Sequence, residues 1–343
     1  MKAANNKHLA SGSANLEKDL ITNHKAIGGY FEWEINSENS LYYDQLVRLN
    51  KGRSALEYIL RSQKYKKLYI PYFICDAILH PLIKLNLDYE FYHIDAQFRP
   101  KIEDIETGSA LLFVNYFGLM NHKLSGLKRK YGELIVDNSM AFFSRPMESI
   151  HAFYSPRKFF GVPDGGFAFV SGNTTPLDVK QDVSYTRTAH LLKRLDVGAE
   201  LGYEDFKKNE SASDRTPMMR MSNLTQKILK SIHYEKVRQI RTSNFLFLHR
   251  HLSSLNELST FINQAVIDGP MSYPFLKKNN SPLRKRLIEN RIYVPQYWPN
   301  ITRWVHTQSL EFYMYANTLP LPVDQRYDEK DMEIVIRLIK HNL

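Results

Sequence analysis

A lysine stands among aromatic and apolar residues in the segment 153–166, which reads FYSPRKFFGVPDGG. A desolvated lysine loses its proton more readily and then acts as an amine nucleophile that can form a Schiff base. A lysine at the surface instead keeps its ammonium group in water and packs its aliphatic stem on its neighbours. Taken alone, Lys158 fits the surface interpretation better, so its chemistry depends on what accompanies it.

An aspartate ends the apolar run at 134–137, LIVD, and is followed by Asn138 and Ser139. A carboxylate at the end of a buried strand can pair with a ring nitrogen, a metal ion or a ribose. A single aspartate more often caps a turn or a helix. Asp137 therefore also needs companions before it indicates a binding site.

A third feature is Gly52-Arg53-Ser54, at the start of a run whose apolar residues have helical spacing, 54–61. Backbone N–H groups at a helix N-terminus bind phosphate with the help of the helix dipole, and glycine lets the phosphate approach the backbone closely. The hydroxyl of Ser54 adds a donor. Ser54 is equally consistent with an ordinary N-cap, so the segment alone is a weak signal.

Together, the three features fit one cofactor, pyridoxal 5'-phosphate (PLP). PLP needs a phosphate site, an acidic partner for its pyridine nitrogen and a lysine that forms a Schiff base with its aldehyde. We therefore expect Lys158 and Asp137 to be catalytic, with Ser139 beside the cofactor. No metal is expected, because the single cysteine excludes a site built from several thiolates.

The elements that must position these groups alternate along the chain. Predicted strands cover 67–71, 89–94, 109–116, 133–137, 150–155 and 166–171, and predicted helices cover 54–61, 75–85 and 123–131. Strands that alternate with helices form a largely parallel sheet, and the active sites of such sheets lie at the carboxyl ends of the strands. The predicted fold class is therefore α/β.

The rest of the chain is predicted to be helical and then mixed. Predicted elements are helices at 180–208, 223–255, 281–289 and 329–341, a polar loop at 209–217 and a strand at 292–295. We expect three parts: a polar N-terminal arm at 1–25, a large domain at 26–245 and a small C-terminal α+β domain at 246–343.

The composition narrows the class of protein. The 343 residues carry a formal net charge of +10 and one cysteine. A single cysteine excludes a disulfide framework within the chain and fits a reducing, cytoplasmic compartment. The N-terminus lacks an apolar signal region, and we expect no membrane partner. The basic residues are scattered and no nucleic-acid-binding motif accompanies them, so we expect no nucleic-acid partner. An anionic small substrate and general solubility are the alternative explanations of the charge.

The sequence resembles the DegT/DnrJ/EryC1/StrS family of sugar aminotransferases, which are fold-type I PLP-dependent enzymes. The resemblance follows the chain in order. It rests on 52–56 (GRSAL), 70–73 (IPYF), 114–118 (VNYFG), Val136-Asp137, Lys158 with Gly165-Gly166, 220–222 (RMS) and 319–322 (LPLP). The segment from the lysine to the glycine pair and Asp137 are the specific parts, and the others support them.

The resemblance implies a fold and an activity. The fold is a large domain with a mainly parallel, seven-stranded type of sheet between helices, followed by a smaller C-terminal α+β domain. The activity is transfer of an amino group, with glutamate as the expected donor, to a nucleotide-linked keto-sugar that feeds surface polysaccharide or lipopolysaccharide. Fold-type I enzymes build their sites at a dimer interface, so a homodimer is implied.

The resemblance also assigns roles to residues. Those of the cofactor site are Gly52, Arg53, Ser54 and Ser155 for the phosphate, Tyr72 or Phe73 for the ring face, Asp137 for the ring nitrogen and Lys158 for the aldehyde. Arg220 is expected near the active site of the dimer. Tyr297 and Trp298 form an aromatic segment that can contact substrate, although ordinary packing of the small domain explains them as well.

Four positions depart from the family's usual residues. Met140 replaces a Gln or His that contacts the ring hydroxyl, and Phe153 replaces a phosphate-binding serine. Met218 stands where an Asn reaches the partner's cofactor, and Cys75 where an aromatic residue stacks on the ring. These departures motivate an alternative function, a catalytically altered PLP-fold protein that acts as a binding or regulatory subunit. Sugar dehydration is disfavoured because related dehydratases carry His in place of the lysine.

Overall fold

The computed structural model describes residues 28–172 and 178–343. Among the described residues, 28–35 belong to a different unit from residues 36–343, and the predicted arm at 1–25 lies outside the described residues. In the first unit, residues 28–35 form no helix or strand. Within the described ranges, no helix is both long enough and apolar enough to cross a membrane.

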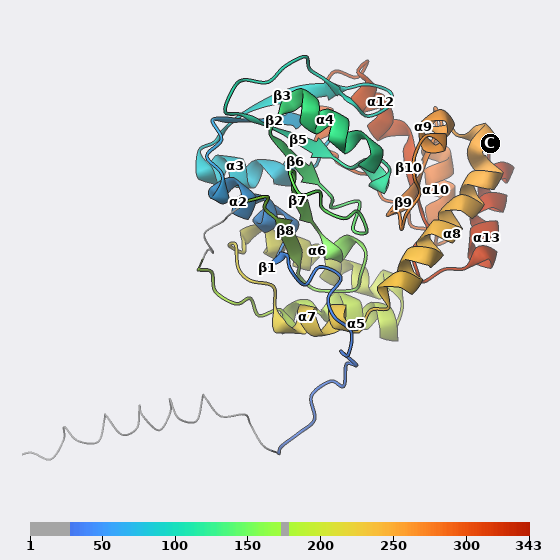
Figure 1. Cartoon of the computed structure of the whole chain (residues 1–343). Coiled ribbons are helices and arrows are strands. Elements are labelled where there is room, and N and C mark those ends of the chain that lie inside the picture. The colour runs from blue at the N-terminus through green and yellow to red at the C-terminus, as the bar shows by residue number, and fades with distance from the viewer. Residues whose placement is uncertain (1–27, 173–177) are drawn as a thin grey trace, which may run out of the picture. The chain divides into compact units, whose positions relative to one another are not determined.

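The second unit is organised around an eight-stranded sheet with the order β1-β8-β7-β6-β5-β2-β3-β4 (Figure 1). The strands are β1 (Val47–Leu49), β2 (Lys67–Pro71), β3 (Asp88–Ile94), β4 (Pro100–Lys101), β5 (Ala110–Val114), β6 (Leu134–Asp137), β7 (His151–Tyr154) and β8 (Gly166–Phe169). Strands β3, β2, β5, β6 and β7 run parallel, while β8, β1 and β4 join antiparallel to their neighbours. The expected α/β class is confirmed, and β4 adds a two-residue eighth strand at one edge.

The central strands are apolar on both faces and are covered by helices. This is typical of the strands of a parallel sheet. All residues of β5 (ALLFV) and β6 (LIVD) are buried, as expected for strands inside a parallel sheet. Helix α2 (Gly52–Ser62) packs against β7 and β8, and α4 (Leu124–Tyr131) packs against β6. Asp137 is thus the last residue of a buried strand, and its carboxylate lies at the carboxyl edge of the sheet.

The glycine pair Gly165-Gly166 lets β8 enter the sheet beside the start of α2. A Cβ atom at Gly166 would collide with the backbone carbonyl of Lys51, so only glycine fits there. Gly165 has φ +132°, and a Cβ atom there would lie 2.7 Å from Cγ of Pro156. The pair therefore brings the N-terminus of α2 close to the turn that carries Lys158.

Among the described residues after β8, the chain is α-helical only from Ala189. The helices are α5 (Ala189–Asp196), α6 (Ala199–Arg215), α7 (Asn223–Lys230) and α8 (Tyr234–Leu252). The helix expected at 180–208 therefore begins later than predicted and is interrupted between α5 and α6. The loop expected at 209–217 is wrong for most of its length, because α6 continues to Arg215. The single long helix expected at 223–255 is instead interrupted between α7 and α8.

The C-terminal part contains a two-stranded antiparallel sheet of β9 (Ser272–Leu276) and β10 (Thr318–Pro322). Its helices are α9 (Ser259–Asn263), α10 (Ser281–Glu289), α11 (Ile301–Trp304), α12 (Leu310–Asn317) and α13 (Glu329–His341). Helix α8 packs against α13 and β9, as Figure 1 shows at the right of the molecule. The strand expected at 292–295 does not form.

Candidate active site

Lys158 and Ser139 meet at the carboxyl edge of the sheet. Lys158 ends a 3-10 turn, Pro156–Lys158, that follows β7, and its backbone N–H donates to the carbonyl of Ser155 at 3.2 Å. The Nζ atom of Lys158 donates to Oγ of Ser139 at 3.1 Å. The Lys158 side chain is exposed rather than desolvated in the chain alone, so its amine is accessible to a ligand.

Asp137 is the buried carboxylate of this cluster, with a relative exposure of 5%. Its Oδ1 atom accepts a hydrogen bond from the backbone N–H of Ser139 at 2.8 Å. Burial raises the pKa of Asp137, while the positive charge of Lys158 and the bonds from Ser139 oppose that rise. A buried carboxylate held in this way gains most from a cationic partner, because pairing offsets the cost of burying its charge.

An amide network fixes the loop that follows Asp137. Nδ2 of Asn115, at the end of β5, donates to Oδ1 of Asn138 at 2.8 Å and to Oδ1 of Asn121 at 2.6 Å. Oγ of Ser144 also donates to Oδ1 of Asn121 at 2.5 Å. The sequence interpretation missed this network because its members come from separate strand ends, which only the parallel sheet brings together.

The N-terminus of α2 lies against the turn of Lys158. A Cβ atom on Gly52 would lie 3.4 Å from Cβ of Ser155, so these two predicted phosphate-site residues are neighbours. The N-cap residue, Lys51, supplies no side-chain cap to the helix. The amides of a first helical turn lack intrahelical acceptors, so this corner, with the Ser155 hydroxyl, can bind an anion.

The side chains of the other two predicted phosphate-site residues point elsewhere. Oγ of Ser54 is buried and donates to Oδ1 of Asn50 at 2.8 Å. The guanidinium of Arg53 lies 3.2 Å from Nδ1 of His80. Neither side chain therefore points toward Lys158. These two residues can contribute to a phosphate site only through their backbone N–H groups.

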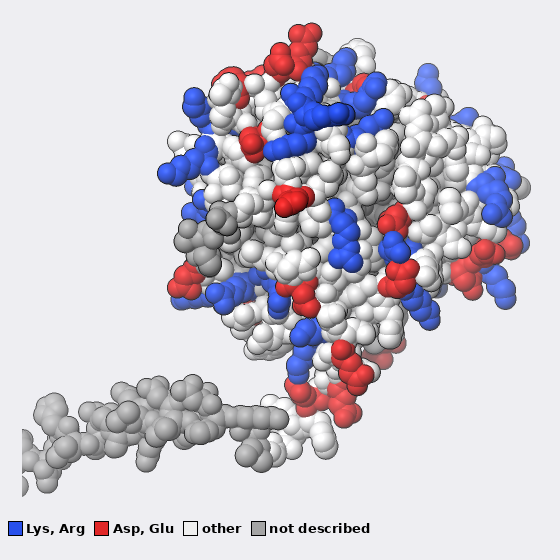
Figure 2. All heavy atoms as spheres, in the orientation of Figure 1, with Lys and Arg blue, Asp and Glu red and all other residues white. Residues whose placement is uncertain are grey.

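A hollow of about 510 Å³ opens beside this corner. Its lining consists of Lys51, Arg53, Ser54, Glu57, His80, Pro81, Ile83, Lys84, Thr216, Pro217 and Met218. Three of these side chains are lysine or arginine, and one is a glutamate, Glu57, which pairs with Lys84 at 2.8 Å. The lining therefore keeps a positive balance of charge, which suits an anionic group. Elsewhere, lysine and arginine side chains are scattered over the face seen in Figure 2, with aspartate and glutamate between them.

The aromatic residues predicted for the ring face pack against other aromatic residues. Tyr72 stacks on Phe91 with a centroid distance of 4.7 Å and an interplanar angle of 9°. Phe73 is 3% exposed and meets the ring of Trp298 edge-on at 4.7 Å. Both rings therefore have structural partners in the chain itself.

Cys75 is the residue of this segment that lies near the cluster. Burial raises the pKa of its thiol, and the charges of Lys158 and Asp137 both act on it. Burial therefore disfavours the thiolate form of Cys75, which is the form of a cysteine that acts as a nucleophile.

The predicted substrate residues are dispersed. Trp298 is nearly buried, and Tyr297 is half-buried and packs against the hydrophobic core, where burial raises its pKa to about 12. Arg220 forms backbone bridges to Leu49 and Gln181, which places its segment beside the end of β1. Arg220 is thus near the start of α2, whereas Tyr297 and Trp298 belong to the C-terminal part.

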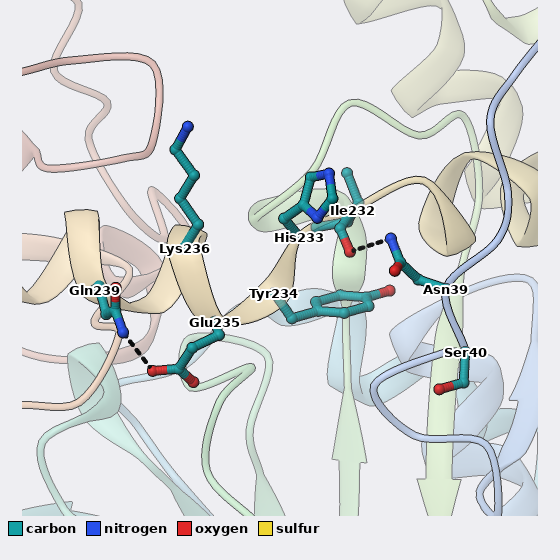
Figure 3. Close-up of a pocket in the computed structure, with 8 residues that line it drawn as sticks. All are labelled: Asn39, Ser40, Ile232, His233, Tyr234, Glu235, Lys236 and Gln239. Atoms are coloured by element: carbon teal, nitrogen blue, oxygen red, sulfur yellow. Dashed lines mark hydrogen bonds between the residues drawn. The ribbon is translucent and has the colours of Figure 1, made fainter.

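A separate hollow of about 740 Å³ lies between residues 39–40 and the start of α8 (Figure 3). In it, Nδ2 of Asn39 donates to the carbonyl of Ile232 at 3.4 Å, and Nε2 of Gln239 donates to Glu235 at 2.8 Å. Its lining includes none of the predicted site residues. Within the described parts of the chain, no cluster of three His, Cys, Asp or Glu side chains could hold a metal ion.

Comparisons with known proteins give a likeness of structure. No protein-family model and no curated protein matches the chain. A DegT DnrJ EryC1 StrS aminotransferase from Brucella abortus is similar, with 15% identity, 97% of this chain and 90% of that chain covered, and a TM-score of 0.59. PseC from Helicobacter pylori, an aminotransferase involved in the biosynthesis of pseudoaminic acid, has 14% identity, 86% coverage of both chains and a TM-score of 0.58.

The PLP-form of Spr1654 from Streptococcus pneumoniae is also similar, with 13% identity, 85% of each chain covered and a TM-score of 0.56. These alignments cover most of each chain, so they include the sheet and the C-terminal part together. The chain therefore has the fold of the sugar aminotransferases, as its sequence predicted.

Proposed function

We propose that the chain binds PLP and belongs to the DegT/DnrJ/EryC1/StrS family. The observation that carries this proposal is the cluster of Lys158, Ser139 and Asp137 at the carboxyl edge of the sheet, beside the Gly52–Ser155 corner. An amine, a buried carboxylate and an anion-binding helix start are the groups that an aldehyde, a pyridine nitrogen and a phosphate require. The residues present therefore fit the cofactor.

In this proposal each residue has a defined task. When bound, PLP supplies a ring that accepts the electron pair left by a departing proton. Lys158 Nζ would hold the cofactor through its aldehyde group and would move the proton of the donor's α-carbon. Asp137 would pair with the positive charge of the ring nitrogen, and its buried position would strengthen that pairing. The Ser139 hydroxyl, 3.1 Å from Nζ, orients the amine.

We further propose that the substrate is a nucleotide-linked keto-sugar and that glutamate donates the amino group. Support comes from the shared fold and from the basic hollow lined by Lys51, Arg53 and Lys84, which suits the phosphates of such a substrate. The product would feed surface polysaccharide or lipopolysaccharide in the cytoplasm, and the single cysteine is compatible with that reducing compartment.

The proposed partner is a second copy of the chain. Helices α5 and α6 carry exposed leucines, with relative exposures of 44% for Leu192, 81% for Leu195 and 64% for Leu201. A group of exposed leucines on adjacent helices is typical of an association surface. Replacing Leu195 and Leu201 together by Glu would convert a dimer into a monomer, which light scattering after size exclusion measures directly.

The function is tested by a half-reaction followed by absorbance. Purified protein loaded with PLP is expected to show a band near the visible edge, and glutamate is expected to remove that band as the amino group passes to the cofactor. A nucleotide-linked keto-sugar should then restore it. Lys128→Ala is the matched control, because Lys128 pairs with Glu133 at the other end of β6 and should leave every step unchanged.

The outcomes separate the competing functions. A band that forms but does not respond to any amino donor would favour the catalytically altered subunit over the aminotransferase. Protein that never takes up PLP would contradict the aminotransferase and leave the catalytically altered subunit. A response to glutamate without recovery on any keto-sugar would retain amino transfer and reject the sugar substrate.

A further inference from the structure

Arg241 is the most deeply buried cation among the described residues of α8, with a relative exposure of 2%. Its guanidinium donates from Nε to Oε1 of Gln325 at 2.9 Å and from Nη2 to the carbonyl of Phe159 at 3.1 Å. Nη1 donates at 3.2 Å to the carbonyls of Pro270 and Met271. Burying a charged group is costly unless its hydrogen bonds are satisfied, and here carbonyl and amide oxygens satisfy them.

The carbonyl of Phe159 is the point at which these contacts reach the candidate site. Phe159 follows Lys158 directly, and its carbonyl accepts a second hydrogen bond, from Nε2 of Gln325 at 2.9 Å. The guanidinium also lies over the Phe159 ring, 4.6 Å from its centroid. Both the carbonyl and the side chain of the residue next to Lys158 are therefore held by Arg241 and by the segment after β10.

The other partners of Arg241 belong to the C-terminal part of the chain. Pro270 and Met271 precede β9, and Gln325 follows β10. Because the start of β9 pairs with the end of β10, one guanidinium joins the segments of both strands at the same end of the two-stranded sheet. The turn of Lys158 is itself short, with the N–H groups of Phe159 and Phe160 donating to the carbonyl of Pro156 at 2.9 Å. A short turn fixed at its last carbonyl has little freedom to tilt the lysine beside it.

We infer that Arg241, together with Gln325, is a positioning residue for Lys158, and that it makes the placement of the lysine depend on docking of the C-terminal part. Burial lowers the pKa of Arg241 to about 10, so the group remains a cation at neutral pH and keeps its charge-assisted bonds. The spectroscopic part of this inference rests on the proposed PLP function, whereas the structural part does not.

The structure offers a matched control on the same helix. Asn244 is also 2% exposed, and its Nδ2 donates to the carbonyls of Val323 at 3.3 Å and Tyr327 at 3.0 Å. It therefore joins α8 to the same C-terminal segment as Arg241 does, without a hydrogen bond to the turn of Lys158. Loss of Asn244 reports what mere loosening of this contact does.

The test compares Arg241→Met, Arg241→Lys, Gln325→Leu and Asn244→Ala in the full-length protein. Amide hydrogen exchange is measured for the peptide spanning 155–161 without cofactor, and the pH midpoint of the visible band is measured with PLP. Arg241→Met is expected to speed exchange in this peptide by about tenfold or more and to shift the midpoint, with a smaller change for Gln325→Leu and partial rescue by Arg241→Lys. Asn244→Ala is expected to lower Tm without either local change.

Several results would overturn the inference. Equal exchange in 155–161 for Arg241→Met and Asn244→Ala at equal loss of Tm would reduce Arg241 to a structural residue. Should Arg241→Met fail to fold, unchanged exchange and band in Gln325→Leu would do the same. Wild-type protein that forms no band would contradict the proposed function instead, while the exchange measurement would still decide the role of Arg241.

Discussion

The residues predicted for the cofactor and for the substrate divide between two regions of very different character. At the carboxyl edge of the sheet, Asp137, Ser139 and Lys158 keep polar groups directed at one another, and the Lys158 amine stays accessible. In the aromatic region, Phe73 and Trp298 pack face to edge and are nearly buried. The sheet positions the polar groups at its strand ends without burying the Lys158 amine, whereas the aromatic rings are buried by packing against one another.

The largest effect is expected for Lys158→Ala. The variant loses both the covalent attachment of PLP and the group that moves the α-proton, so turnover should fall by roughly 10³-fold or more. Steady-state amino transfer measures the loss, with Lys128→Ala as the control. Turnover within a few fold of wild type would show that Lys158 is not a catalytic residue. The cluster of Asp137, Ser139 and Lys158 would then lack the proposed function.

Asp137→Asn is expected to separate activity from stability. Turnover should fall by about 10²-fold, because the neutral amide cannot hold the charge of the ring nitrogen. The protein without cofactor should become more stable at neutral pH, because the buried carboxylate costs free energy there. Steady-state assays measure the expected fall in turnover, and thermal melts of the same preparation measure the expected rise in stability.

The stability gain of Asp137→Asn has a defined pH dependence. Burial raises the pKa of Asp137 above its ordinary value of 3.8, so the folded protein keeps this proton to higher pH than the unfolded chain does. Wild type therefore loses stability as the pH rises from 3.8 through the raised value, and the variant does not. The difference in Tm should grow across that window and vanish below it; a difference independent of pH would contradict the assignment.

Trp298→Ala tests the aromatic region. Loss of a nearly buried indole that packs on Phe73 should lower the free energy of unfolding by about 3–5 kcal/mol. The folded fraction should still bind PLP with the wild-type band. Denaturant unfolding and absorbance measure both quantities, and a raised KM for the sugar at unchanged stability would instead make Trp298 a substrate residue.

Ser139→Ala should give the smallest effect. It removes one hydrogen bond to Lys158 Nζ, worth about 0.5–1.5 kcal/mol, so PLP affinity should weaken by no more than about tenfold. Ser62→Ala, which removes a hydroxyl at the far end of α2, is the matched control for titration with PLP. Equal affinities for the two variants would show that Ser139 does not orient the amine.

The sequence was sufficient where local pattern determines structure. Strand β2 and helices α10 and α13 have the predicted bounds, because an apolar run or an amphipathic period marks each of them. Asp137 and Lys158 were predicted for a similar reason, since Asp137 ends one strand pattern and Lys158 comes shortly after another. The parallel sheet then brings strand ends together at one edge, which the alternation of elements already implied.

The sequence was insufficient where distant contacts decide. Strands β9 and β10 were missed because Pro274 and Pro320, which lie opposite each other in the pair, are typical of turns, yet a two-stranded sheet has only edge strands and tolerates them. Tyr72 stacks on Phe91 of the neighbouring strand β3, and the sequence alone does not show that these two rings meet. Arg241 was missed because an arginine in a helix usually lies at the surface.

The central claim, that Lys158 anchors the cofactor, is tested most directly by reducing PLP-loaded protein with borohydride and mapping the modified peptide by mass spectrometry. We expect a single pyridoxyl group on Lys158, in the peptide that contains residues 156–164. Modification of another lysine, or of none while the visible band is present, would contradict it.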